Sequence, residues 1–305
     1  MSLVVVGSIA FDAVKSPFGE RERMLGGAAV HFSLAASFFG DVRVVGPVGE
    51  DFGEDEYAVL HGRGVNTDDI EHVAGGETFF WKAHYEFDMN QAHTEDTRLG
   101  VFGEFEPKLS DASKSAETLF LANIQPDVQR GVREQSGAGL VGLDSMNLWI
   151  ETARDSLLET IAGVDLVLLN DAEIRMLTEQ PNMLRAARAI MDMGPSAVIA
   201  KQGEYGAALF TRGGYFAIPA FPLETVMDPT GAGDSFAGGL LGYLASQDEW
   251  TDDATLRRGM TYGSVLASFN VQEFGTERVA RLTRAEIDER FGQFRAMTAL
   301  EAAPD

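Results

Sequence analysis

The segment DPTGAGDSF, residues 228–236, has the composition of a phosphate-binding turn. Val226 and Met227 before it predict the end of a strand, and the apolar residues after it recur at helical spacing. Glycines at 231 and 233 leave the N–H groups of the turn unobstructed. Free N–H groups at the start of a helix, supported by the helix dipole, bind anions, so the segment predicts a phosphate site.

Asp234 lies at the start of the predicted helix, where a carboxylate has two interpretations. It can accept the proton of a hydroxyl nucleophile during phosphoryl transfer, or it can cap the helix. The local residues favour neither interpretation over the other. In both cases the helix dipole predicts a pKa of Asp234 below its usual range.

The composition excludes several classes of site and partner. The 305 residues include no cysteine, which excludes disulfides, zinc–thiolate sites and cysteine nucleophiles. The formal net charge of −23 predicts no nucleic-acid partner and no anionic-membrane partner. The acidic residues are spread along the chain, which indicates either a soluble acidic surface or adaptation to a salty environment. Without a membrane-spanning apolar run or a signal peptide pattern, we expect a cytoplasmic protein.

Strand-like and helical patterns alternate along the chain. Short apolar runs predict strands buried on both faces, and the patterns between them, such as residues 26–40 and 182–194, predict helices. This alternation predicts an α/β protein with a mostly parallel sheet covered on both faces, whose ligands bind beyond the carboxyl ends of the strands. The predicted strands lie within residues 3–9, 42–49, 118–124, 139–145, 164–170 and 196–203.

Residues 77–87, ETFFWKAHYEF, interrupt this pattern because their apolar residues alternate with a period of two. Such alternation predicts a half-buried strand. We expect residues 73–105 to form a small β insertion, to which residues 11–24 add a hairpin. An aromatic stripe of this kind could stack on a nucleobase, although it more often belongs to a core. One face of the predicted strand carries Phe79, Trp81, Ala83, Tyr85 and Phe87.

The segment DPTGAGDSFAGG resembles the signature of the ribokinase (PfkB) family of carbohydrate and nucleoside kinases. Four further segments resemble family motifs in the same order: GGAAVHFSLAASFFG, VGPVGEDFG, LNDAEIRML and AKQGEYGAAL. The resemblance covers nearly the whole chain. It implies a ribokinase-like three-layer α/β/α fold, with residues 1–10, 25–72 and 106–305 in the core and residues 11–24 and 73–105 in a β lid.

The resemblance also implies an ATP-dependent kinase and assigns roles around the nucleotide. Asp234 would be the catalytic base, and Gly203 would let the nucleotide approach the backbone. Lys201 could reach a phosphate, or it could be an ordinary solvated lysine. The anion hole would consist of the N–H groups of Gly231, Ala232 and Gly233.

Two pairs of residues would serve metal ions. In the family's Asn-x-x-Glu motif, Asn170 and Glu173 would place a magnesium ion and its waters, and one glutamate suffices because magnesium takes few protein carboxylates. The same spacing also suits a capping box. Asp228 and Thr230 occupy positions where the family often supports a monovalent cation.

On the acceptor side, Asp12 would grip hydroxyl groups, because a carboxylate accepts hydrogen bonds from several donors. His31 stands where the family commonly has Asn, and it would contact the acceptor unless it is a core histidine satisfied inside its helix. Few basic residues are available for an acceptor that already carries a phosphate, so we expect an unphosphorylated one. Further candidate contacts are Gly26, Gly27, Asn123 and Gln125.

We therefore expect a kinase that phosphorylates a primary hydroxyl of a small molecule, with a free sugar slightly favoured over a nucleoside. The lid would exclude water and could also pack against a second subunit, so we expect a homodimer. One alternative is a catalytically silent sensor or assembly protein on the same fold, which the intact Asp234 and Glu173 oppose. Another is an oxidoreductase, which would need a Gly-x-Gly-x-x-Gly turn after the first strand.

Overall fold

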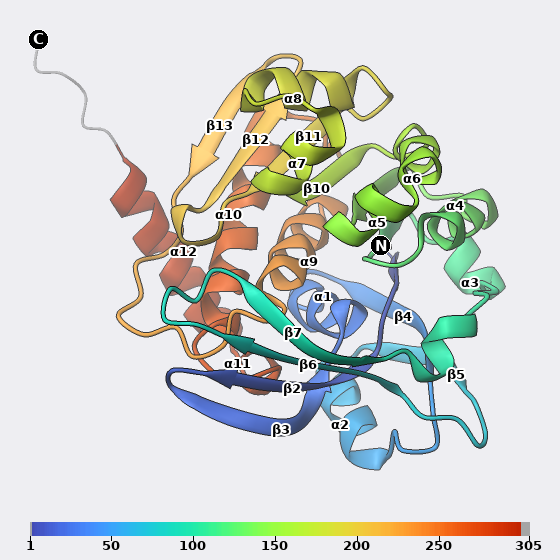
Figure 1. Cartoon of the computed structure of the whole chain (residues 1–305). Helices are drawn as coiled ribbons and strands as arrows, with labels where there is room; N and C mark the ends of the chain where they lie inside the picture. The colour runs from blue at the N-terminus through green and yellow to red at the C-terminus, as the bar shows by residue number, and fades with distance from the viewer. Residues whose placement is uncertain (1, 300–305) are drawn as a thin grey trace, which may run out of the picture.

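A computed structural model describes residues 2–299 and has a three-layer α/β/α architecture (Figure 1). The seven strands from β11 to β5 run parallel, and β12 and β13 add an antiparallel edge. This confirms the predicted fold class. The order across the large sheet is β13 (Gly214–Ile218), β12 (Ala207–Thr211), β11 (Ala197–Lys201), β10 (Leu166–Asn170), β9 (Leu140–Asp144), β8 (Thr118–Leu121), β1 (Ser2–Val6), β4 (Asp41–Val48) and β5 (Asn66–His72).

Helices cover both faces of this sheet. Alternate side chains of β1 enter two separate apolar clusters, Leu3 and Val5 on one face and Val4 and Val6 on the other, as expected for a strand buried on both sides. None of the helices in residues 2–299 is long and apolar enough to cross a membrane. The first face carries α1 (Ala28–Ala36), α2 (Glu54–Gly62), α9 (Ala232–Ala245), α10 (Asp253–Asn270), α11 (Glu277–Ala280) and α12 (Arg284–Thr298). The second carries α3 (Asp111–Lys114), α4 (Pro126–Gln135), α5 (Asn147–Thr152), α6 (Arg154–Ile161), α7 (Asp171–Thr178) and α8 (Met183–Met191).

A second sheet of four strands packs beside α1 (Figure 1). The predicted alternation holds only in the second half of β6, where Ala83 and Tyr85 are buried and Lys82 is exposed, because all three residues of its first half are half-buried. It is wrong for Phe87, which is 93% exposed because the strand ends at Tyr85 and the chain turns. The role of this sheet as a lid or a dimer interface stays a prediction. Its order is β3 (Gly19–Gly26), β2 (Ala10–Ser16), β6 (Phe79–Tyr85) and β7 (Ala92–Arg98).

The predicted strand that ends at Met227 is wrong. After β13 the chain runs without a helix or strand from residue 219 to residue 231, and α9 begins at Ala232. Pro219, Pro222 and Pro229 lack the N–H groups that a strand would donate to a neighbour. The N–H of Met227 donates instead to the carbonyl of Val271, 2.8 Å away, which ties this segment to the end of α10.

Helix α9 packs closely against its neighbours because several of its residues lack side chains. A Cβ on Gly238 would lie 2.3 Å from the carbonyl oxygen of Phe32 in α1. Real Cβ atoms do not approach an oxygen this closely, so the spacing between the two helices depends on this glycine. The position of the start of α9, where the glycine-rich turn lies, depends in turn on that spacing.

We predict that Gly238→Ala destabilises the chain by about 1–3 kcal/mol, because the added methyl overpacks the contact between α1 and α9. Gly292→Ala in α12 is the matched control, since a Cβ there meets nothing within 4 Å. It should be neutral or stabilising by up to about 1 kcal/mol, because alanine favours helix more than glycine does. Urea unfolding monitored by circular dichroism compares them, and equal effects would contradict the packing argument.

Candidate active site

Three polar side chains stand at the carboxyl ends of three adjacent parallel strands. Asp144 ends β9, Asn170 ends β10 and Lys201 ends β11. The strands are in register, with Leu168 paired to Asp144 and Asn170 paired to Lys201. In open α/β sheets, ligands bind at this edge. The start of α9 lies at the same edge, because Lys201 Nζ would be 3.2 Å from a Cβ on Gly233.

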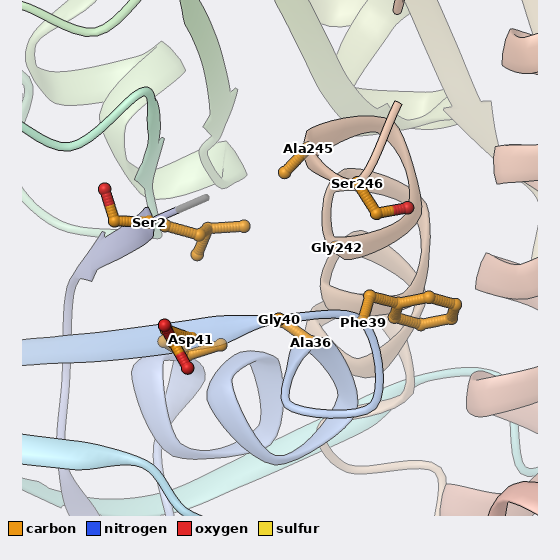
Figure 2. Close-up of a pocket in the computed structure, with 10 residues that line it drawn as sticks. Ser2, Ala36, Phe39, Gly40, Asp41, Gly242, Ala245 and Ser246 are labelled. Carbon is orange, nitrogen blue, oxygen red and sulfur yellow. The ribbon is translucent and has the colours of Figure 1, made fainter. Parts of the chain in front are cut away.

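A small pocket at the opposite edge is not a credible substrate site. It lies where β1 and β4 begin, against the last turn of α9 (Figure 2). Its volume is about 10 Å³, which has room for roughly one water molecule. A sugar or nucleotide does not fit there. The carboxyl edge is the candidate active site because the polar side chains that end β9, β10 and β11 gather at it. Labelled residues that line the small pocket include Ser2, Phe39, Asp41, Gly242 and Ser246.

The glycine-rich turn has the geometry of an anion site. Gly231 caps α9 in the left-handed conformation, with φ of 74°, and Ala232 begins the helix. A Cβ on Gly231 would lie 2.3 Å from the His31 ring, so glycine is required for both its conformation and its contact. The N–H of Ala232 donates to the carbonyl of Pro229 at 3.1 Å, whereas the N–H of Gly233 has no partner within this 14-residue helix, which suits a phosphate.

Asp234 lies in the first turn of α9, and its environment corrects one expectation. Burial, together with the charge of Asp144, raises the pKa of Asp234 to about 7, and Lys201 opposes this shift only in part. The expectation that the helix dipole would lower this pKa is therefore wrong. Desolvation outweighs the dipole. A carboxylate with this pKa is a far better proton acceptor near neutral pH than an ordinary aspartate.

Lys201 is not a solvated lysine. Its side chain is 19% exposed, and Nζ lies 2.5 Å from Oδ2 of Asp144, whose side chain is 6% exposed. Glu173 and Asp234 also attract the ammonium and, with Asp144, raise the pKa of Lys201 against the effect of burial. The sequence analysis missed Asp144. Its signal was available, because it is the polar residue that ends a predicted buried strand.

Asn170 and Glu173 form the capping box that their spacing allowed. The N–H of Glu173 donates to Oδ1 of Asn170 at 2.7 Å, and Oε2 of Glu173 accepts from the N–H of Asn170 at 2.8 Å. Burial raises the pKa of Glu173 to about 7, a shift that Lys201 opposes. The capping role and a role near a metal are compatible, because the capping bond uses one carboxylate oxygen of Glu173.

Asp228 holds the turn that precedes the anion site. It is fully buried, and it accepts hydrogen bonds from the N–H groups of Thr230 at 2.9 Å and Gly275 at 3.0 Å. Burial raises its pKa. The hydroxyls of Thr230 and Tyr85 lie 3.1 Å apart, which links the turn to the small sheet. Gly203, with φ of 56°, begins the short helical turn after β11.

Asp12 lies against the double glycine. It is 4% exposed, and a Cβ on Gly26 would lie 2.0 Å from its Oδ2. The N–H of Gly27 donates to the carboxylate, but burial dominates and raises the pKa of Asp12 to about 7. Asp228 and Asp234 raise it further, so these three acids lie within electrostatic reach of one another.

His31 lies flat against Gly231 but is not fully satisfied in the core. Its Nδ1 lies 3.0 Å from Oδ1 of Asn270, whose Nδ2 donates to the carbonyl of Thr230 at 2.7 Å. That second bond fixes Oδ1 as the acceptor, so Nδ1 of the neutral ring carries the proton. Burial lowers the pKa of His31 to about 4. Nε2 is therefore a buried acceptor without a partner among the described residues, which suits a ligand hydroxyl.

Of the two candidates after β8, only Asn123 is tied to the neighbouring helix α5. Its Oδ1 accepts from Nε1 of Trp149 at 3.0 Å. Gln125 is exposed at the start of α4, and no contact described for it links it to the other candidates. Asn270 is a further residue that sequence analysis missed, because only the tertiary fold carries it to the turn.

The residues present fit a nucleotide phosphate and a divalent ion. Gly231 starts the turn without a side chain and packs against the His31 ring, and Lys201 supplies a cation beside Gly233. Within residues 2–299, no group of three or more His, Asp or Glu side chains is arranged to hold a metal by itself. That is compatible with magnesium, which keeps several waters and uses one or two carboxylates together with substrate phosphates.

Comparison with known proteins agrees with this geometry. The model of the pfkB family of carbohydrate kinases matches residues 112–281, more than half of the chain. The cytidine kinase of Thermococcus kodakarensis is 28% identical over 247 residues, which cover 79% of this chain and 87% of that protein. The nucleoside kinase of Methanothermobacter thermautotrophicus is 28% identical over 291 residues, which cover 90% and 91%.

Solved structures show the same fold at low sequence identity. A Burkholderia thailandensis nucleoside kinase in complex with inosine superposes with a TM-score of 0.78 at 22% identity, covering 95% of this chain and 97% of that chain. A putative ribokinase II from E. coli in complex with ATP and Mg²⁺ superposes with a TM-score of 0.80 at 20% identity, covering 96% and 99%.

We predict that Asp234→Asn stabilises the chain more at pH 8 than at pH 5. The pKa of Asp234 is raised on folding, so its contribution to stability is most favourable below the unfolded-state pKa and is lost as the pH rises through about 7. Asparagine removes the buried charge. We expect the melting temperature to rise by about 2–4 °C at pH 8, the shift for roughly 1 kcal/mol. A gain that is equal at both pH values would contradict the raised pKa.

Proposed function

Because the chain belongs to the pfkB family of carbohydrate kinases, whose members transfer phosphoryl groups to hydroxyls, we propose that it transfers the γ-phosphate of ATP to a primary hydroxyl of a nucleoside. The observation that carries the proposal is the position of Asp234. Its carboxylate, with a pKa raised to about 7, stands in the first turn of α9 directly after the glycine-rich anion site.

The reaction follows from these residues. Asp234 accepts the proton of the acceptor hydroxyl while the hydroxyl oxygen forms its bond to the γ-phosphorus. The bond from that phosphorus to the bridging oxygen of ADP breaks, and ADP leaves. N–H groups of Gly231, Ala232 and Gly233 hold the transferring phosphoryl oxygens. Magnesium, when bound near Glu173, neutralises charge on the phosphates.

Asp12 and His31 would orient the acceptor. Asp12 accepts hydrogen bonds from hydroxyls, and the unpartnered Nε2 of His31 accepts one more. Both residues lie near the start of α9. His31 packs against Gly231, and Asp12 is close enough to Asp234 for the charge of Asp234 to raise the pKa of Asp12. The acids Asp12, Asp228 and Asp234 would repel an acceptor that already carries a phosphate, which supports an unphosphorylated one.

Two observations favour a nucleoside over the free sugar that the sequence slightly favoured. Two relatives that cover most of this chain are named cytidine kinase and nucleoside kinase. In addition, Trp81 pairs in register with Asp12 between β6 and β2, so the two side chains share one face of the small sheet. A half-buried indole beside a hydroxyl-binding carboxylate supports stacking on a nucleobase.

We predict magnesium- and ATP-dependent release of ADP with nucleosides and not with free pentoses or hexoses. Asp234→Asn should lower turnover at least about 100-fold, the contribution of a general base, while it keeps ATP binding. A coupled ADP assay against both acceptor panels measures this, with ATP affinity measured by calorimetry. Release with sugars alone would change the acceptor class. Near-wild-type turnover of Asp234→Asn would remove the base, and no release with any acceptor would favour a sensor on this fold.

A further inference from the structure

The salt bridge between Lys201 and Asp144 lies beside the glycine-rich turn, where a bound phosphate would bring further negative charge. Lys201 Nζ is 2.5 Å from Oδ2 of Asp144 and would be 3.2 Å from a Cβ on Gly233. The ammonium thus lies between a buried carboxylate and the turn that would hold phosphate. Glu173 and Asp234 attract the same ammonium, so one cation serves three acids.

The two partners differ in their freedom to move. Asp144 is the last residue of a central strand, and its Oδ1 accepts a hydrogen bond from the N–H of Ser145 at 2.8 Å. Lys201 carries its charge on a flexible four-carbon stem and keeps 19% of its side chain exposed. Phosphate oxygens on the Gly231–Gly233 turn would attract the ammonium away from Asp144. The carboxylate would then be a buried charge that needs a new cation.

A second feature of this loop points to a ligand. The hydroxyl of Ser145, a residue 4% exposed, has no hydrogen-bond partner among the described residues. Buried hydroxyls are normally satisfied, so a group from outside the chain is expected beside it. The hydroxyl oxygen of Ser145 and the Oδ2 atom of Asp144 are oxygen ligands of the kind that divalent ions bind directly, and both can accept hydrogen bonds from waters bound to such an ion.

We propose that Lys201 is an internal counter-ion that excludes a divalent metal ion from Asp144 until a nucleotide binds. Nucleotide phosphate draws the ammonium onto the glycine-rich turn, and Asp144 then joins Glu173 in holding the metal, directly or through water. The pair makes metal binding conditional on nucleotide. This inference rests on the proposed function, since it takes the turn to be a nucleotide phosphate site.

Mn²⁺ binding, monitored through the enhancement of water-proton relaxation, tests the counter-ion role of Lys201 without any need for turnover. Wild type with Mn²⁺ alone should show only the weak relaxation enhancement that comes from Mn²⁺ bound to its acidic surface. Lys108 is an exposed lysine, so the control variant Lys108→Met should show the same enhancement as wild type. Lys201→Met without nucleotide should gain about one site per chain, at least about tenfold tighter than wild type, a usual size for coupling between two ligands. Lys201→Met with Asp144→Asn should lose it.

Each outcome has one reading. If Lys201→Met, folded by circular dichroism, gains no site, or if nucleotide-free wild type already binds Mn²⁺ as tightly, the counter-ion role is overturned and the kinase proposal stands. If that variant does not fold, the wild-type protein is measured with Mn²⁺ and ADP. The relaxation enhancement should then exceed that of the Mn²⁺–ADP complex without protein. Absence of this enhancement would overturn the proposed nucleotide site and the inference with it.

Discussion

The candidate site depends on one electrostatic constraint, which is that several carboxyl groups are held out of water at one edge of the sheet. Asp12, Glu173 and Asp234 each have a pKa raised to about 7, chiefly by burial. Asp228 is fully buried, and two backbone N–H groups satisfy it. Holding acids in this way costs stability near neutral pH, and the acids lie where the proposed phosphoryl transfer needs a base and a place for a cation.

The fold meets this constraint through the arrangement of its backbone. Parallel strands in register bring the ends of β9, β10 and β11 together, although the three residues there are separated in sequence by up to 57 positions. The turn before α9 is held by Asp228 and by Asn270, which also sets the tautomer of His31. One contact network therefore positions both the turn proposed to bind phosphate and the His31 ring proposed to contact the acceptor.

Sequence patterns predicted the parts of this account that local chemistry determines. The apolar runs and the glycine-rich start of α9 each carry their signal within a few residues, whereas the approach of Gly26 to Asp12 depends on the pairing of β2 with β3. The pKa of Asp234 could not be predicted, because it depends on Asp144, which lies 90 residues away, and on burial that only the folded chain creates. The strand predicted up to Met227 failed because prolines removed its donors, a cost that apolar character alone does not reveal.

Burial turns Asp234 into a base suited to neutral pH. Carbon-13 NMR of the chain labelled at aspartate carboxyl carbons measures the pKa of this group directly, with the Asp234→Asn spectrum identifying the resonance. We expect a carboxyl carbon that titrates near pH 7 in the wild type and is missing from the variant. A resonance that titrates near pH 4, where exposed aspartates do, would contradict it.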